Sequence, residues 1–189
     1  NHIDDPYNFI KGCKNILKPN GILILEFPDL DQLLEKISFD TIYHEHRNYY
    51  SRSSLIKIFK KMNLNIFKFE KLEYMSGSLR IYIKNTDFNK KFSIKNNEQK
   101  NLKSFKNFKL RNKLIKKEII SFIKIKKREG KIIAGFGAAT KGNTLLNYCN
   151  INSKQIKFIL ETSIHKINKF TPLSGIPIVD ENKNYIFRL

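Results

Sequence analysis

The stretch PNGILILEFP, residues 19–28, decides the fold class of this chain. Pro19, Asn20 and Gly21 are turn residues that end a preceding helical pattern. The run that follows them is apolar at almost every position. Such a run is typical of a strand that is buried on both faces of an α/β sheet. We therefore predict an α/β protein and place the remaining elements around this strand.

The first half of the chain continues the α/β pattern on both sides of the strand. Asp5 followed by Pro6 is typical of a helix N-terminus, and Ser51 or Ser53 can cap a later amphipathic helix. Two strand-like runs joined through Ser76 and Gly77 predict an antiparallel hairpin. The predicted elements are a helix at 6–18, the strand at 21–28, a short helix at 29–37, a helix at 54–62 and hairpin strands at 64–75 and 78–85.

A polar stretch and a long helix follow the hairpin. Residues 87–100 are polar and charged, which is typical of a linker. Apolar residues then recur at helical spacing from about residue 101 to residue 129 among many lysines. This pattern predicts a long basic amphipathic helix that packs against its own domain. An interaction of this helix with a partner or a membrane surface is the alternative.

The end of the chain reads as a second α/β domain. The strand KIIAGFGA, the helix TKGNTLLNYC and the strand IKFILE form a βαβ unit over residues 131–161. A further strand is predicted to begin within residues 184–189, so this domain looks cut short. We predict two domains, residues 1–88 and residues 89–189.

The composition invites a nucleic-acid interpretation but does not favour it. The net charge is +19, and the chain holds thirty lysines and six arginines. Clustered lysine and arginine bind nucleic-acid phosphates. Here, however, the lysines are spread from Lys11 to Lys183, which is typical of a solvated surface. Residues 90–131 are the best candidate if a nucleic-acid site exists.

No targeting feature stands out in the sequence. No apolar run approaches the roughly 18 residues that a membrane span needs, and no basic-then-apolar leader opens the chain. Cys13 and Cys149 lie far apart without a CxxC pair, so we expect reduced thiols and no structural zinc site. We predict a cytoplasmic protein without a membrane partner.

The loop FDTIYHEHRNYYS, residues 39–51, concentrates groups that carry chemistry. Histidine accepts a proton near neutral pH, a neighbouring glutamate can orient it, and tyrosine can donate to a developing oxyanion. Loops just beyond a buried strand are where α/β proteins place their active sites. Catalysis and a merely polar loop remain open as interpretations of this stretch.

A metal site is a third interpretation of the same loop. His44 and His46 would share one face of an extended segment, with Glu45 on the other. Zinc usually takes at least three protein ligands, so His2 or His165 would have to complete the set.

The stretch GFGAATKGNT, residues 135–144, follows a predicted strand and opens a helix. Its small residues can bring backbone N–H groups and a helix N-terminus close to a phosphate, and Lys141 adds a positive charge. It matches neither a Walker A loop nor the dinucleotide fingerprint. The pattern indicates anion binding in general, with a tight structural turn as the alternative.

Together, FDTIYHEHRNYYS, GSLRIY, GFGAATKGNTLLNYC and TPLSGIPI resemble the nucleotide-sugar C-methyltransferases, which use S-adenosylmethionine in branched deoxysugar biosynthesis. The resemblance covers residues 1–178, with the motifs in the family's order. It implies methylation of the carbon beside the ketone of a dTDP-linked 4-keto-deoxysugar. The helix, strand, helix and hairpin of the first half then correspond to the C-terminal half of a class I, Rossmann-like methyltransferase sheet, followed by a second, truncated Rossmann-like domain.

The resemblance also implies roles for single residues. His46 corresponds to the base that removes the proton at C3 of the sugar, Glu45 and Tyr43 to residues that position the sugar and its enolate oxygen, and His2 to an active-site histidine. The expected substrate-binding residues are His44, Arg80, Gly135, Gly137, Lys141, Gly142, Asn143 and Thr144.

Family members are longer than this chain and begin with a cysteine-rich zinc module and a glycine-rich loop for S-adenosylmethionine. Neither motif occurs in this sequence. We therefore expect a fragment that neither binds the donor tightly nor turns over alone, with zinc only in the missing module. The alternatives are a sugar-nucleotide-binding module without chemistry and a basic nucleic-acid-binding protein; the oligomeric state stays open.

Overall fold

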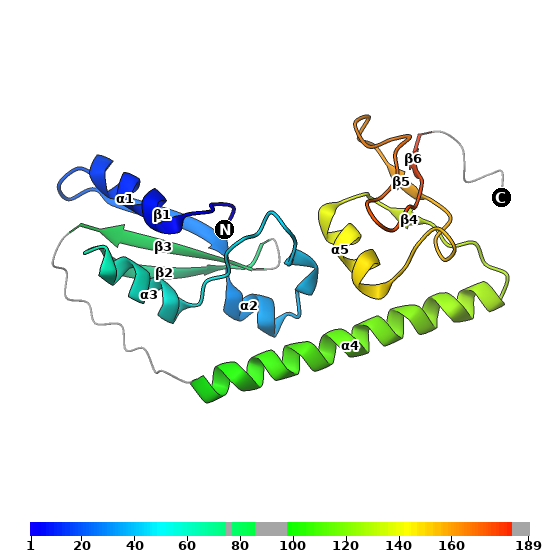
Figure 1. Ribbon diagram of the computed structural model, residues 1–189, viewed down its shortest axis with the longest axis horizontal. Helices are drawn as coiled ribbons and strands as arrows, with labels where there is room; N and C mark the ends of the chain where they lie inside the picture. Colours follow the sequence, from blue (N-terminus) through cyan, green and yellow to red (C-terminus); the bar gives the residue numbers. More distant parts are fainter. Residues whose placement is uncertain (75–76, 86–97, 183–189) are drawn as a thin grey trace. The chain divides into compact units, whose positions relative to one another are not determined.

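The computed structural model describes residues 1–74, 77–85 and 98–182 (Figure 1). The chain forms two compact units. The first comprises Asn1–Phe39 and His44–Phe108, and the second comprises Asp40–Tyr43 and Lys109–Leu189. The predicted domain boundary after residue 88, most of the predicted linker and the predicted strand within 184–189 lie outside the described residues.

The first unit is built around a three-stranded sheet with the strand order β1-β3-β2. β3 lies between the other two strands and is antiparallel to both, so the predicted hairpin of β2 and β3 is confirmed. Figure 1 shows α1 and α3 beside this sheet. The elements are α1 (Pro6–Ile16), β1 (Ile22–Pro28), α2 (Leu30–Glu35), the 3₁₀ turn η1 (Phe39–Thr41), α3 (Arg52–Lys61), β2 (Asn65–Leu72) and β3 (Ser78–Lys84).

The helices of the first unit begin where side chains cap them. Asp5 Oδ1 accepts a hydrogen bond from the Asn8 amide at 3.0 Å, and Ser51 Oγ accepts one from the Ser54 amide at 3.1 Å. Each cap satisfies an amide that has no partner within its own helix. The predicted cap at Asp5 is confirmed, and of the two serines proposed for α3 the structure uses Ser51.

The prediction that the strand at 21–28 is buried on both faces is wrong. Ile22 is 49% exposed and Ile24 is 52% exposed, whereas Leu23 and Leu25, which point to the opposite face of the strand, pack against the core. The central strand is β3, where Leu79, Ile81 and Ile83 are 0% exposed. The core of the first unit therefore centres on the second strand of the hairpin.

The second unit contains a parallel sheet with the order β4-β5-β6. The predicted βαβ unit is confirmed, and α5 has the predicted bounds. Its strands are shorter than predicted, and β6 was not predicted. The elements are α4 (Glu98–Arg128), β4 (Gly135–Phe136), α5 (Thr140–Cys149), β5 (Ile159–Glu161) and β6 (Ile178–Asp180).

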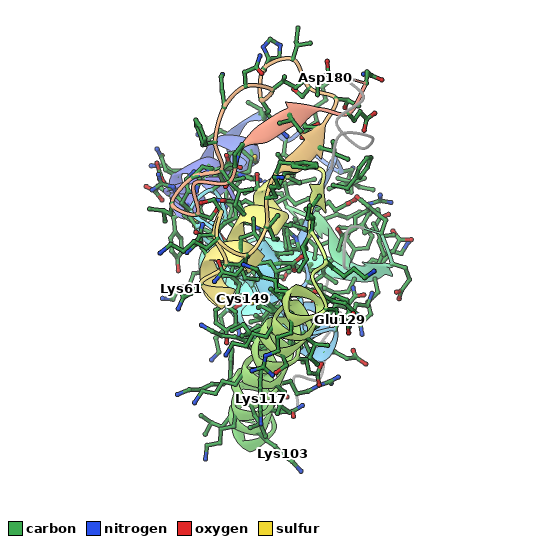
Figure 2. The ribbon with its side chains drawn as sticks, turned by 90° about the vertical axis from the view of Figure 1, so that its right-hand side faces the viewer. Lys61, Lys103, Lys117, Glu129, Cys149 and Asp180 are labelled. Carbon is green, nitrogen blue, oxygen red and sulfur yellow. The ribbon has the colours of Figure 1, made fainter. Side chains whose placement is uncertain are left out.

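The helix α4 packs on the second unit through part of its length. Ile123 is buried in the same cluster as Leu146, Cys149 and Ile176, which supports packing against its own domain. Figure 2 shows lysine side chains, including Lys117, that project from α4. No helix among the described residues is both long and apolar enough to cross a bilayer. Both cysteines are free thiols.

Candidate active site and nucleotide loop

The start of the chain holds the histidine-rich loop of the first unit. The Asn1 carbonyl accepts hydrogen bonds from the amides of Arg47 at 2.8 Å and Asn48 at 3.3 Å. The Asn48 side-chain amide donates to the Ile3 carbonyl at 2.7 Å, and Arg47 forms an ion pair with Asp4 at 2.6 Å. Backbone and side-chain contacts therefore fix the two segments against each other.

This arrangement brings two of the predicted catalytic residues together. The rings of His2 and His46 lie edge to face, with their centroids 4.9 Å apart. The Tyr49 ring lies close to the His46 ring, with the two ring centroids 6.3 Å apart. His46 is half-buried and His2 is exposed, so the pair reaches from the loop to solvent.

The other predicted residues of the loop occupy a turn. His44 and Glu45 are exposed at its tip, and Tyr43 is half-buried. Tyr43 belongs to the second unit, whereas His44 begins the part of the loop that belongs to the first. These three residues directly precede His46 in the sequence, and their roles in catalysis remain predictions.

An apolar cavity of about 180 Å³ lies beside the loop in the first unit. Tyr50, which follows the histidines, lines it together with Phe27 at the end of β1, and their ring centroids are 5.4 Å apart. Burial raises the pKa of the Tyr50 phenol, with a smaller contribution from Tyr7. Tyr50 therefore stays a neutral hydrogen-bonding group at physiological pH.

Arg80 is engaged within the sheet of the first unit. Its guanidinium contacts Glu26 on β1 at 2.8 Å and Glu70 on β2 at 3.5 Å. The Tyr82 hydroxyl also donates to Glu70 at 2.6 Å. Contact with Tyr82, followed by Glu26, raises the pKa of Arg80, and the Tyr82 hydrogen bond lowers the pKa of Glu70. Arg80 thus ties three strands together, and its predicted contact with substrate remains untested.

The metal interpretation gains no support from the geometry. Within residues 1–74, 77–85 and 98–182, no group of three histidine, cysteine, aspartate or glutamate side chains could hold a metal ion.

Two glycines shape the turn that follows β4 in the second unit. A Cβ at Gly135 would lie 3.0 Å from the Ile159 side chain, so the glycine lets β4 approach β5 closely. Gly137 has a φ of +81°, a conformation that residues with a Cβ rarely adopt. Its amide donates to the Leu160 carbonyl at 2.8 Å. Gly135 therefore lets the two strands pair closely, and Gly137 turns the chain after β4 toward α5.

A cavity of about 170 Å³ opens on this turn. Four of the predicted binding residues line it, namely Gly135, Gly137, Gly142 and Asn143. Thr171 and Pro172 of the TPLSGIPI stretch line it as well. The Asn143 Oδ1 atom is buried and has no hydrogen-bond partner among the described residues. A buried acceptor without a partner is rare and suits a ligand that donates.

Lys141 and Thr144, the other two predicted residues of the turn, lie in the first turns of α5. Both are half-buried. The Thr144 hydroxyl donates to the Thr140 carbonyl at 3.1 Å, so its proton is used inside the helix.

Sequence reasoning missed Glu161, the last residue of β5. Its carboxylate accepts backbone hydrogen bonds from Ser163, Ala138 and Thr162, which together lower its pKa to about 2. The signal that would have found it is its place at the end of the second strand of a βαβ unit, where nucleotide-binding folds carry a carboxylate.

The comparisons with known proteins agree with this architecture. Residues 1–68 match a family model described as a methyltransferase domain, which places the first unit in the methyltransferase class. Residues 74–185 match the model of a C-methyltransferase C-terminal domain. The chain belongs to the C-methyltransferase family, and the resemblance seen in the sequence is confirmed at that level.

A curated relative supports the same family. The chain is 28% identical over 186 residues to the C-methyltransferase NovU of Streptomyces niveus. The match covers 94% of this chain and 44% of that relative, so the chain spans less than half of the relative's length.

Proposed function

We propose that this chain provides the base and the sugar-nucleotide side of a C-methyltransferase that acts on a nucleotide-diphosphate 4-keto-deoxysugar. The observation that carries the proposal is the contact of His46 with His2, at 4.9 Å between ring centroids. Family membership and the two-unit architecture support it. The proposed setting is the cytoplasm, with no nucleic-acid or membrane partner.

The chemistry requires a base at the carbon that loses its proton and a hydrogen-bond donor at the ketone oxygen, which are the two ends of the enolate. In the proposal, His46 takes the proton from the sugar carbon beside the ketone, and the electron pair of that C–H bond moves onto the ketone oxygen. Tyr43 donates a hydrogen bond to the enolate oxygen, and Glu45 positions the sugar. His2 is exposed, so it gives the proton a route to solvent.

The turn after β4 is the proposed site of the nucleotide diphosphate, in a domain that we propose is Rossmann-like. Among the described side chains none caps α5 at Ala139, so no side-chain cap occupies the end of the helix where the positive end of its dipole lies. Lys141 adds charge beside the phosphates. Asn143 Oδ1, buried without a described partner, suits an N–H or O–H group of the nucleoside or sugar.

The family implies S-adenosylmethionine as methyl donor, but the turn between β1 and α2 does not fit a glycine-rich donor loop. β1 passes into α2 through Asp29, whose carboxylate accepts a hydrogen bond from the Asp31 amide at 3.1 Å. This is a helix cap with a negative charge, not a glycine-rich turn.

Proton abstraction by His46 can be tested without S-adenosylmethionine. The protein is incubated in D₂O with a dTDP-linked 4-keto-deoxysugar, and NMR follows the exchange of deuterium into the carbon beside the ketone. The substitution His46→Gln should slow the catalysed exchange by about 10²- to 10⁴-fold, the usual contribution of a general base. Affinity for dTDP should change less than about threefold, because the nucleotide binds to the other unit.

The matched control is His165→Gln, which changes an exposed histidine outside the loop and should exchange at the wild-type rate. An exchange rate that survives His46→Gln within about tenfold would refute the assignment of the base.

A further inference from the structure

We infer that Glu161 is a positioning residue that locks the turn between β4 and α5, and that it does not read the ribose of a bound nucleotide. The inference rests on the proposed function, because it concerns how the same site handles its nucleotide. The alternative is the role that such a carboxylate has in dinucleotide-binding folds, where it accepts a hydrogen bond from a ribose hydroxyl. Glu161 ends β5, the second strand of the unit, and so occupies the corresponding place.

The hydrogen bonds of the carboxylate decide between the two roles. Oε2 accepts from the Ala138 amide at 2.9 Å and from Lys166 Nζ at 3.4 Å. Oε1 accepts from the amides of Thr162 at 3.0 Å and Ser163 at 3.1 Å. An ionised carboxylate offers about four acceptor positions, so a ribose hydroxyl would have to displace one of these donors. The side chain is only 11% exposed, which restricts access further.

The bond to Ala138 is the one that matters for the site. It joins the end of β5 to the turn, directly beside the bond from the Gly137 amide to the Leu160 carbonyl at 2.8 Å. Two successive amides of the turn are thus fastened to the neighbouring strand. The negative charge of Glu161, which lies beside the Ala138 amide, also disfavours an anion at that amide. A diphosphate is therefore directed to the first turn of α5.

Two consequences follow for binding. Because the Glu161 carboxylate is already occupied, the 2′-hydroxyl of a ribose adds no hydrogen bond to it. The site should therefore bind 2′-deoxyribonucleotides and ribonucleotides with the same affinity. Without the hydrogen bond between Ala138 and Glu161, both nucleotides should bind more weakly by the same factor, because the turn must then be ordered on binding.

The experiment compares the full chain with Glu161→Gln and Lys166→Ala by calorimetry with dTDP and with its ribo counterpart, 5-methyluridine diphosphate. Wild type should bind the two within about threefold of each other. Glu161→Gln removes the negative charge and leaves one acceptor oxygen, which cannot serve the Ala138 amide together with the amides of Thr162 and Ser163. It should weaken the binding of both nucleotides about tenfold, the typical effect of one charge-assisted hydrogen bond. Lys166→Ala removes only a half-exposed ion pair and should stay within about twofold.

Hydrogen exchange of the Ala138 amide, measured with the melting temperature, gives a readout that needs no ligand. Faster exchange in Glu161→Gln at an unchanged melting temperature supports the lock. Unchanged exchange overturns it, as does a preference of wild type for the ribonucleotide of about tenfold or more that Glu161→Gln abolishes. If wild type binds neither nucleotide, the proposed function fails, and the Ala138 exchange still decides the role of Glu161.

Discussion

The two units fasten their candidate loops in different ways. In the first unit, main-chain carbonyls of Asn1 and Ile3 hold the loop of His46, beside a sheet whose strands are seven or eight residues long. In the second unit, strands of two or three residues carry the glycine-rich turn, and the side chain of Glu161 holds it together with one main-chain bond from Gly137. A sheet of short strands has few main-chain hydrogen bonds between strands, so single side chains contribute more to the position of the turn.

The difference extends to what stabilises each unit. The first unit depends on apolar packing along β3, where Ile81 is fully buried. In the second unit, the chain before β6 is organised by Thr171, whose hydroxyl accepts from the Ile176 amide at 2.9 Å and bonds to Ser174 Oγ at 2.6 Å. Substitutions along β3 should therefore act through cavities, whereas substitutions in the segment before β6 should act through unpaired polar groups.

The largest effect on stability is expected from Ile81→Ala in the first unit. It removes a fully buried side chain from the central strand and should cost about 2–5 kcal/mol, the range for such cavities. Hydrogen exchange of peptides from residues 65–72 in urea measures the loss. The control Ile24→Ala changes a 52% exposed residue on β1 and should cost less than about 1 kcal/mol. Equal losses would show that β1 and β3 contribute alike.

A smaller effect is expected from Thr171→Val in the second unit. The substitution keeps the shape of the side chain but leaves the buried Ile176 amide without its acceptor, which costs about 1–3 kcal/mol. Peptides from residues 171–180 should exchange faster. Leu173→Ala, at a 96% exposed position in the same loop, should change the stability by less than about 0.5 kcal/mol. A loss from Thr171→Val no greater than that of this control would show that these polar contacts do not stabilise the segment before β6.

The smallest effect is a local one in acid. Backbone hydrogen bonds, chiefly from Ser163 and Ala138, lower the pKa of Glu161 from 4.5 to about 2. Since the folded pKa is the lower one, the stabilisation is complete above pH 4.5 and is lost as the pH falls toward 2. The NMR shift of the Ala138 amide should follow this titration, while the Gly137 amide, bonded to a carbonyl, should respond little. A midpoint near the ordinary value for glutamate would contradict the lock.

The sequence predicted most of the fold because its signals are local. Asp5 and Ser51 cap their helices as the pattern indicates, and α5 begins and ends where its sequence places it. The strand β1 was predicted, but its predicted burial on both faces was wrong, because an apolar run specifies a strand and not which of its faces is covered.

The candidate site was only partly predictable. The motifs supplied His46 and Asn143 as candidates, whereas for Glu161 the βαβ pattern marks only a place at the end of β5 and not what its carboxylate binds. Its role depends on a bond to Ala138, which lies 23 positions away in the chain.

By itself, the sequence determined the family, the helices and the chemical groups available in the two loops, since caps, periodicity and motifs act over a few neighbouring residues. Only the tertiary structure decided that His2 meets His46, that Arg80 ties three strands together and that Glu161 fastens the glycine-rich turn. Each of these contacts joins residues far apart in the chain, and their approach depends on how whole elements pack.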